Sequence, residues 1–365
     1  MKILKNIILS LLTGANIVTI VLMVVVSYSD RINPAQFPLL GCLGLLLPVF
    51  IIINLLFLIV WVIVKWRRIW LPVVGFALAY VPIRTYIPIH PTSPEVPEGS
   101  MKVVTWNVAG YDANRDTMAL HSVLSYLEQQ QADIVCLQED MGVRKQRPFE
   151  RMKSLFPYND TVHVNNKRNH YINAVGIHTR FPIVKKQKIN LGSSANGSAA
   201  FFLLIDGDTV VVVNNHLEST HLSHNERQRY NDVLKGDMER DSVRQETSLL
   251  MHKIARHMAR RAPQADAMHQ YIDSIGRRYP VIVCGDFNDT PISYVYHTMS
   301  KGLTDCFVET GNGIGLSYNR KGFFFRIDHL LCSSHFVPYG CKVDSKIDAS
   351  DHYPVLCWLK KTDNL

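Results

Sequence analysis

The first quarter of the sequence has few charged residues, and negative charge is almost absent from it. Residues 1–90 contain eight charged side chains, and Asp30 is the one acidic residue among them. Seven basic residues and one acidic residue give this stretch +6 of the formal net charge of +8, which leaves +2 for the other 275 residues. So small an excess excludes a broad basic face for binding nucleic acid.

The sequence also lacks the spacings on which cysteine-dependent folds rely. Its seven cysteines include no C-x-x-C pair and no zinc-finger spacing, although a bridge between Cys306 and Cys341 stays open. A hydrophobic content of 47% without an internal repeat excludes a disordered chain, a coiled coil and a small disulfide-rich scaffold.

Long apolar runs are confined to the N-terminal part. Ile7–Ser27 and Leu39–Val64 each exceed the ~20 residues that a helix needs to cross a bilayer. Ile69–Ile87 is a weaker third candidate, because it contains two prolines and Arg84. A cleaved signal peptide is the alternative for the first run, but the second run directly behind it favours an anchored bundle. We therefore predict a transmembrane region of about three helices over residues 1–88.

Basic residues predict the orientation of these helices, because lysine and arginine collect on the cytoplasmic side. Lys2 and Lys5 precede the first run, and Lys65, Arg67 and Arg68 lie between the second and third. This places the N-terminus inside and predicts a multi-pass protein of the cell (inner) membrane with an extracytoplasmic catalytic domain. If the third run does not cross, the domain is cytoplasmic instead.

Residues 89–100 contain several prolines and read as a short linker, and residues 101–365 as one catalytic domain. Short Val- and Ile-rich runs there alternate with helical patterns, which predicts an α+β fold. The expected strands are Lys102–Val108, Ile134–Gln138, Ala174–Thr179, Phe201–Ile205, Thr209–His216, Val281–Cys284, Arg326–Cys332 and Val355–Leu359. The expected helices are Thr117–Gln130, Glu226–Leu234, Arg240–Arg261 and Gln264–Arg278.

Polar residues stand at the ends of the strongest strands. They are Asn107, Glu139, His216, Asp286, Asn288, Asp328, Asp351 and His352. A single acid or amide at a strand end is usually a turn or cap residue. So many in one domain indicate a site, because charge at the mouth of a sheet must be solvated, paired or bound to metal.

Five segments in this order resemble the endonuclease/exonuclease/phosphatase superfamily of metal-dependent phosphoesterases: TWNVAGY, DIVCLQED, VVNNHLES, VIVCGDFND and SDHYP, with RIDHL before the last. The resemblance covers residues 101–360. It implies a four-layered α/β/β/α sandwich of two mixed sheets with helices outside.

The resemblance also implies a metal site. Glu139 matches the family's metal carboxylate, Asn107 would help to position the metal or the phosphate, and Asp351 would be a second carboxylate on the metal side. Hard oxygen ligands suit Mg²⁺, with Mn²⁺ as an alternative.

Catalytic roles follow for the other matched residues. Asp286 would orient or deprotonate the attacking water, and Asn288 would hold a phosphate oxygen or that aspartate. His216 matches a histidine that deoxyribonuclease-like and sphingomyelinase-like members use near the phosphate. His352 would contact the scissile phosphate, with Asp328 as the carboxylate partner that fixes its tautomer and raises its pKa.

The sequence leaves two interpretations open for each of three features. Asp289 is a turn residue or a ligand, and Arg326 meets an anionic substrate or forms an ion pair at the sheet edge. The helix Arg240–Arg261 covers a sheet or forms a basic lip beside the pocket, within the 217–280 insertion.

The sequence thus favours a membrane-anchored, Mg²⁺-dependent phosphoesterase that acts on lipid-linked or small phosphorylated substrates. The alternatives are a tethered extracytoplasmic nuclease and a catalytically silent binding domain on the same fold. A phosphorylated lipid or nucleotide is the expected partner, and no stable nucleic-acid partner is expected, because a chain with so little excess charge neutralises few phosphates.

Overall fold

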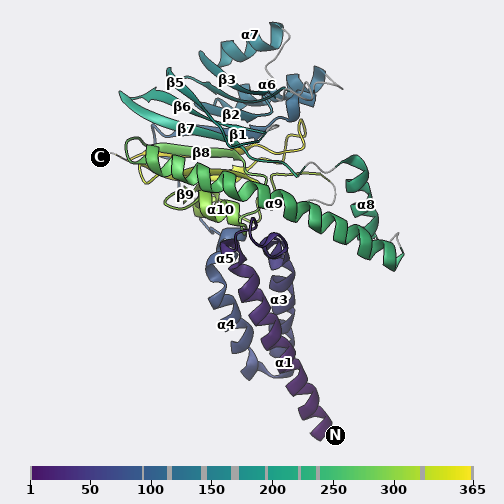
Figure 1. Ribbon diagram of the computed structural model, residues 1–365. Coiled ribbons are helices and arrows are strands. Elements are labelled where there is room, and N and C mark those ends of the chain that lie inside the picture. Colours follow the sequence, from purple (N-terminus) through teal and green to yellow (C-terminus); the bar gives the residue numbers. More distant parts are fainter. Residues whose placement is uncertain are drawn as a thin grey trace.

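The computed structural model describes residues 2–92, 94–112, 117–140, 146–165, 172–193, 196–220, 223–235, 239–320 and 325–362. A narrow bundle of N-terminal helices projects from one side of a larger α/β part, with the N-terminus at its far end (Figure 1).

The bundle contains two segments that are long and apolar enough to cross a membrane, Ile3–Arg31 and Pro38–Val64. The third predicted segment is bent by 66° between α4 and α5, so it is one broken span or a re-entrant loop. Pro82 explains the break, because it has no N–H for the carbonyl of Leu78. The Tyr28 hydroxyl donates to that carbonyl instead, at 2.8 Å.

The elements of the bundle are α1 (Lys2–Ser27), η1 (Ser29–Arg31), α2 (Pro38–Gly41), η2 (Leu43–Leu46), α3 (Leu47–Val64), η3 (Trp66–Arg68), α4 (Trp70–Leu78) and α5 (Tyr80–Tyr86).

Buried polar side chains hold α1 against α3. Asn16 Nδ2 donates to Asn54 Oδ1 at 3.2 Å, and Trp61 Nε1 donates to Asn16 Oδ1 at 2.8 Å. Arg68, in the turn after α3, donates to the carbonyl of Leu9 at 2.8 Å. Hydrogen bonds between helices stabilise bundles in lipid. These contacts place the basic turn after α3 beside the N-terminal half of α1.

The α/β part contains two six-stranded sheets, with the orders β11-β12-β1-β2-β4-β3 and β5-β6-β7-β8-β10-β9. One central pair in each sheet is parallel, β1 with β2 and β7 with β8, and the other pairs are antiparallel. The strands are β1 (Met101–Asn107), β2 (Ile134–Gln138), β3 (Tyr158–Asn165), β4 (Ile172–Thr179), β5 (Ile183–Ile189), β6 (Ser198–Ile205), β7 (Asp208–His216), β8 (Val281–Asp286), β9 (Thr304–Asp305), β10 (Asp328–Cys332), β11 (Phe336–Val343) and β12 (Val355–Lys361).

Successive residues of a strand alternate between the core between the two sheets and the outer, helix-covered face of their sheet. Val103 on β1 and Ile282 on β8 belong to the core between the sheets, together with Phe201. Their neighbours Val104 and Val283 face outward, the first against α6 and α7 and the second against α9 and α10. The four-layered α/β/β/α sandwich of two mixed sheets is thus confirmed (Figure 1). The remaining helices are α6 (Thr117–Gln130), α7 (Gln146–Leu155), α8 (His224–Lys235), α9 (Arg240–Gly276), α10 (Tyr294–Met299) and α11 (Cys306–Thr310), with the short η4 at Ala109–Asp112.

Two expectations differ from the structure. The predicted helices Arg240–Arg261 and Gln264–Arg278 form one helix, α9, which continues through Pro263. Ala262 and Ala265 on either side of the proline are fully buried, so packing on the sheet outweighs the roughly 3 kcal/mol that a proline costs within a helix. The bridge between Cys306 and Cys341 is not present. All seven cysteines are free and buried.

The bundle and the catalytic part are locked together. Arg326, directly before Ile327 and β10, is 2% exposed and donates to the carbonyls of Thr85, Tyr86 and Ile314. Its guanidinium therefore satisfies the C-terminal carbonyls of α5. Neither interpretation drawn from the sequence, a substrate contact or an ion pair, describes this arginine.

Gly285 on β8 is a position that only glycine suits. Its φ is +123°, and a Cβ there would lie 2.0 Å from the carbonyl oxygen of Asn215 on β7. We expect Gly285→Ala to destabilise the fold by at least about 2 kcal/mol, which lowers the melting temperature by roughly 5 °C in a domain of this size. Gly276→Ala is the matched control, because its Cβ would meet only Val281 at 3.8 Å. Equal melting temperatures for the two variants would contradict the prediction.

Candidate active site

The predicted site residues meet at one end of the sandwich. The parallel strands β1 and β2 end there with Asn107 and Gln138 side by side, and Glu139 follows. In the other sheet His216 pairs with Asp286 at the ends of β7 and β8. β10 runs antiparallel to β8, so its first residue, Asp328, lies beside Asp286.

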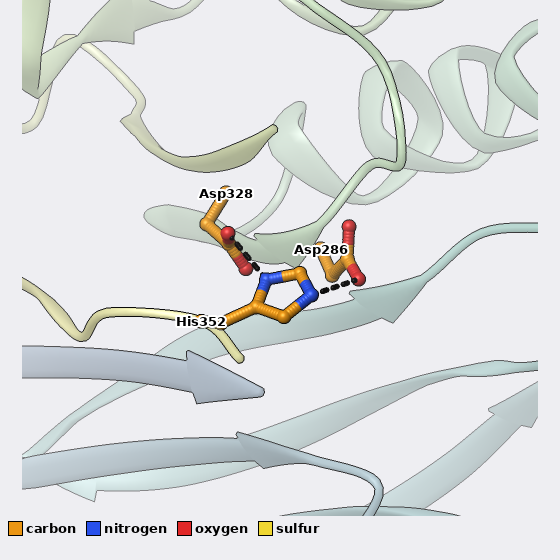
Figure 2. Close-up of side chains that lie close together, drawn as sticks. All are labelled: Asp286, Asp328 and His352. Carbon is orange, nitrogen blue, oxygen red and sulfur yellow. Dashed lines mark hydrogen bonds and ion pairs between the residues drawn. The ribbon is translucent and has the colours of Figure 1, made fainter. Parts of the chain in front are cut away.

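His352 lies between two carboxylates, as Figure 2 shows. Its Nδ1 lies 2.8 Å from Asp328 Oδ2, and its Nε2 lies 3.7 Å from Asp286 Oδ2. Trp106 Nε1 donates to the His352 carbonyl at 2.8 Å, and Tyr318 packs edge-on against the imidazole ring. The ring is therefore fixed in position, with Nε2 directed toward Asp286.

The carboxylates change the protonation of this group. Burial opposes the charged imidazolium, but Asp328 and Asp286 outweigh that effect and raise the pKa of His352 to about 10. Burial raises the pKa of Asp286, and the negative charge of Asp328 adds to this, whereas His352 and His216 act in the opposite direction. A protonated His352 beside an Asp286 that binds protons more readily than usual is suited to proton transfer at neutral pH.

Asn107 and His216 connect Asp286 to Glu139. Asn107 Nδ2 lies 3.1 Å from Asp286 Oδ2 and 3.4 Å from Glu139 Oε1. His216 Nε2 lies 3.6 Å and 3.9 Å from the same two oxygens. Asn107 thus presents its N–H group to the carboxylates, while its Oδ1 accepts from the amide of Ala109 at 3.0 Å.

Two site residues have strained backbones. Glu139 has φ of +53° and Asn288 has φ of +54°, a region that non-glycine residues seldom adopt and that is concentrated at functional sites. The amide of Asn288 donates to Asp286 Oδ1 at 2.8 Å, so this turn orients the aspartate. The Asn288 side chain donates to the Leu217 carbonyl at 3.1 Å. The contact of Asn288 with phosphate stays a prediction.

The donor set fits a divalent cation. Glu139, Asp286 and Asp351 line one pocket, and Asp328 lies behind His352. Arg320 Nε lies 3.2 Å from Asp351 Oδ2. Burial raises the pKa of Asp351, but the positive charges of His352 and Arg320 outweigh burial and keep that pKa below its usual range. Asp286, Asp328 and His352 also lie within 4.8 Å of one another, but the 2.8 Å contact engages both His352 Nδ1 and Asp328. The carboxylates of Glu139 and Asp351 line the same pocket, and their role as hard oxygen ligands of Mg²⁺ stays a prediction.

The sequence did not point to a second buried ion pair at the pocket. Arg261 Nε lies 3.2 Å from Asp289 Oδ2, and both side chains are almost fully buried. Arg261 also donates to the carbonyl of Glu218 at 2.9 Å. Asp289 is therefore an ion-pair partner that joins α9 to the loop after β8. The sequence signal for Arg261 was weak, because it lies among many arginines of one helix.

Asn173 is another residue that the sequence did not reveal. Its Nδ2 lies 3.3 Å from His216 Nδ1, and it is 4% exposed. Asn173 lies near the start of β4, directly before the strand run expected from Ala174. An amide between an expected loop and a strand carries no motif, so only the fold brings it to the histidine.

The pocket has a volume of about 330 Å³. Its polar end is lined by site residues, and its walls include residues of α9 and of the N-terminal bundle. The lining comprises Leu45, Asn107, Ala109, Glu139, His216, Ser219, Thr220, Ile254, Met258, Arg261, Asp286, Asn288, Asp289, Thr290, Tyr318, Phe325, Ile327, Asp351 and His352.

The model of the endonuclease/exonuclease/phosphatase family matches residues 104–352, which include every predicted site residue. The chain belongs to this family. Members of the endonuclease/exonuclease/phosphatase family are divalent-metal-dependent hydrolases of phosphoester bonds. Residues 9–86 match a separate domain of unknown function, and a search of curated protein sequences finds no match.

Solved structures share the family fold at low identity. The human nocturnin catalytic domain with bound sulfate is 16% identical, covers 73% of this chain and 97% of its own, and has a TM-score of 0.52. A mannosyl-6-phosphatase from Bacteroides thetaiotaomicron is 18% identical over 72% of this chain and 100% of its own, with a TM-score of 0.51. A family protein from Beutenbergia cavernae is 17% identical over 72% of each chain, with a TM-score of 0.53.

The contact between His352 and Asp328 predicts a non-additive pair. Asp328→Asn removes the negative charge that stabilises the imidazolium and keeps the shape, so we expect turnover to fall at least ~10²-fold. His352→Ala should cost at least as much, and the double variant little more, because the two residues act as a unit. The measurement is kcat for the three variants on one chromogenic phosphoester. Losses that multiply in the double variant would show that His352 works independently of Asp328.

Proposed function

We propose that this chain is a membrane-anchored, Mg²⁺-dependent phosphoesterase that hydrolyses lipid-linked or small phosphorylated substrates. The observation that carries the proposal is the His352 ring held between Asp328 and Asp286 at the polar end of a pocket. The mannosyl-6-phosphatase with the same fold is named for a small phosphorylated substrate, which is in keeping with the proposal.

Phosphoester hydrolysis needs an activated water, a neutralised phosphate and a stabilised leaving oxygen. In the proposed reaction Asp286 accepts the proton of the attacking water, since its raised pKa makes it a better base than an exposed aspartate. The water oxygen bonds to phosphorus as the ester P–O bond breaks, and the leaving oxygen takes a proton from solvent. His352 donates from Nε2 to a phosphate oxygen, while Asp328 holds the ring and stabilises its charge. His216 and Asn107, the predicted substrate-binding residues beside Asp286, would contact the phosphate, with Asn288 beyond them.

A bound Mg²⁺, or Mn²⁺ as the alternative, would neutralise phosphate charge when held by Glu139 and Asp351, with Asn107 beside them. The proposed partner is a phosphorylated lipid or nucleotide, and a stable complex with nucleic acid is not part of the proposal. Residues 91–365 carry +2 of formal charge, which is too little to neutralise many phosphates of a duplex.

Glu139→Gln tests the metal site and the activity together. We expect at least a ~10²-fold loss of turnover on bis-p-nitrophenyl phosphate, because the amide keeps the shape but removes a metal-binding charge. Excess Mg²⁺ should restore part of the lost turnover. Mg²⁺ should also raise the melting temperature of the wild type more than that of the variant. Glu128→Gln is the matched control, since Glu128 pairs with Arg151 on the surface.

The same assay, with and without chelator, should include supercoiled plasmid. Chelator-sensitive cleavage of the ester with intact plasmid supports the proposal, whereas rapid nicking of plasmid would favour the tethered nuclease. Unchanged turnover of Glu139→Gln would remove this residue from the metal site, and no hydrolysis of any ester would leave a silent binding domain.

For the topology, we propose that the catalytic domain lies outside the cytoplasm of a multi-pass inner-membrane protein. The basic turn at residues 65–68 lies at the end of the bundle away from the catalytic part, beside Leu9. All native cysteines are buried, so single cysteines at the exposed positions Glu95 and Lys65 can be compared. An impermeant maleimide should label Glu95→Cys in intact cells and Lys65→Cys only after lysis. The reverse pattern would place the domain in the cytoplasm.

A further inference from the structure

The catalytic pocket has a wall that comes from the membrane region. Leu45 of η2 lines it together with Ile254 and Met258 of α9, and Asp286 and His352 line the same pocket. Leu45 and Ile254 are half-buried, whereas Met258 is 3% exposed. One cavity therefore joins an apolar wall to the polar residues of the site.

This wall lies next to the start of the long apolar helix α3. Leu45 precedes α3 by two residues, and the 18 residues of α3 extend about 27 Å, close to the ~30 Å of hydrocarbon in a bilayer. The N-terminal end of α3 is the end that contacts the catalytic part, because Leu47 packs in a cluster with Ile292 from the loop after β8. Leu45 thus lies between the apolar helix α3 and the active site.

The wall is a fixed part of the fold. Leu45, Met251 and Ile254 pack on a buried cluster of Cys42, Ala255 and Met258. A Cβ on Gly44 would lie 1.9 Å from the carbonyl oxygen of Ile292, so η2 lies directly on the loop that follows Asp286 and Asn288. The distance between the apolar wall and the site residues is therefore set by direct backbone contact.

We propose that Leu45, Ile254 and Met258 form a subsite for the hydrocarbon part of a membrane-resident phosphoester. This inference rests on the proposed phosphoesterase function and adds the substrate class. A small, fully polar phosphorylated substrate would gain nothing from an apolar wall in the pocket. A lipid phosphoester has its phosphate next to a hydrocarbon chain, which matches the arrangement of polar and apolar residues in this pocket. The volume of about 330 Å³ suits a headgroup and the first part of a chain, within the roughly 300–1,000 Å³ of ligand pockets.

The test uses the full chain in detergent and a series of chromogenic diesters, the methyl, butyl and octyl esters of p-nitrophenyl phosphate, each below its micelle concentration. Burial of one methylene strengthens binding roughly three- to fourfold. We expect kcat/KM of the wild type to rise at least about tenfold from methyl to octyl, because several methylenes would be buried. In Leu45→Asn and Ile254→Asn the ratio of kcat/KM for the octyl ester to that for the methyl ester should fall to about three or less, since each substitution removes part of the apolar wall.

Leu249→Asn is the matched control on α9, because Leu249 is 58% exposed and does not line this pocket. It should keep the wild-type ratio. Ile254→Trp is a second test, which fills the subsite instead of making it polar and should also lower the ratio. Circular dichroism and thermal melting establish that each variant is folded.

The outcomes separate the two proposals. A wild-type ratio near one, or variants at Leu45 and Ile254 that keep the wild-type ratio, would overturn the subsite while leaving the phosphoesterase intact. No hydrolysis of the methyl ester, and none of the monoester p-nitrophenyl phosphate, with Mg²⁺ present, would overturn the phosphoesterase itself. A ratio that falls in the Leu45 and Ile254 variants but not in the control supports the lipid substrate class.

Discussion

The site depends on a buried polar contact that sets the two sheets against each other. Gln138 Nε2 on β2 donates to Asn214 Oδ1 on β7 at 2.7 Å, and both side chains are completely buried. Asn214 Nδ2 in turn donates to the carbonyls of Leu137 and Gly176 at 2.9 and 2.8 Å. An unsatisfied buried amide is costly, so a slip between the sheets is disfavoured. Because Gln138 directly precedes Glu139, this contact also fixes the distance from the metal-side carboxylate to His216 and Asp286.

A second constraint comes from the N-terminal helical bundle, which is part of the structural support of the site. Arg326 satisfies the last carbonyls of α5 and stands two residues before Asp328. Burial lowers the pKa of Arg326, although Asp305 raises it in part. Separation of the bundle would remove two of the three carbonyls that accept from this buried cation and leave that of Ile314. The N-terminal helices therefore position the strand that begins with Asp328, and they are more than a tether.

The sequence could predict the centre of this fold and not its periphery. Central strands are apolar on both faces and end in polar residues, so β1, β2, β7 and β8 and their site residues could be identified. The strands at the four sheet edges, β3, β5, β9 and β11, were all missed. β5, for example, reads IVKKQKI with exposed lysines, which discourages pairing between edges and hides the strand pattern. Arg261 and Arg326 could not be assigned from the sequence, because their partners are a distant aspartate and backbone carbonyls that only the fold brings near.

The arrangement of charge explains why catalysis in this pocket calls for a cation. The one arginine that lines the pocket, among the residues that the structure describes, is Arg261, and its ion pair with Asp289 neutralises it. The carboxylates of Glu139, Asp286 and Asp351 line the same space. Arg320 offsets the charge of Asp351 and His352 that of Asp328, which leaves Glu139 and Asp286 in excess. A phosphate that enters would meet net negative charge in a partly desolvated site, where repulsion is stronger than in water. The divalent cation proposed at the Glu139 side would reverse this balance, and the half-buried apolar wall near Leu45 would contribute attraction that does not depend on charge.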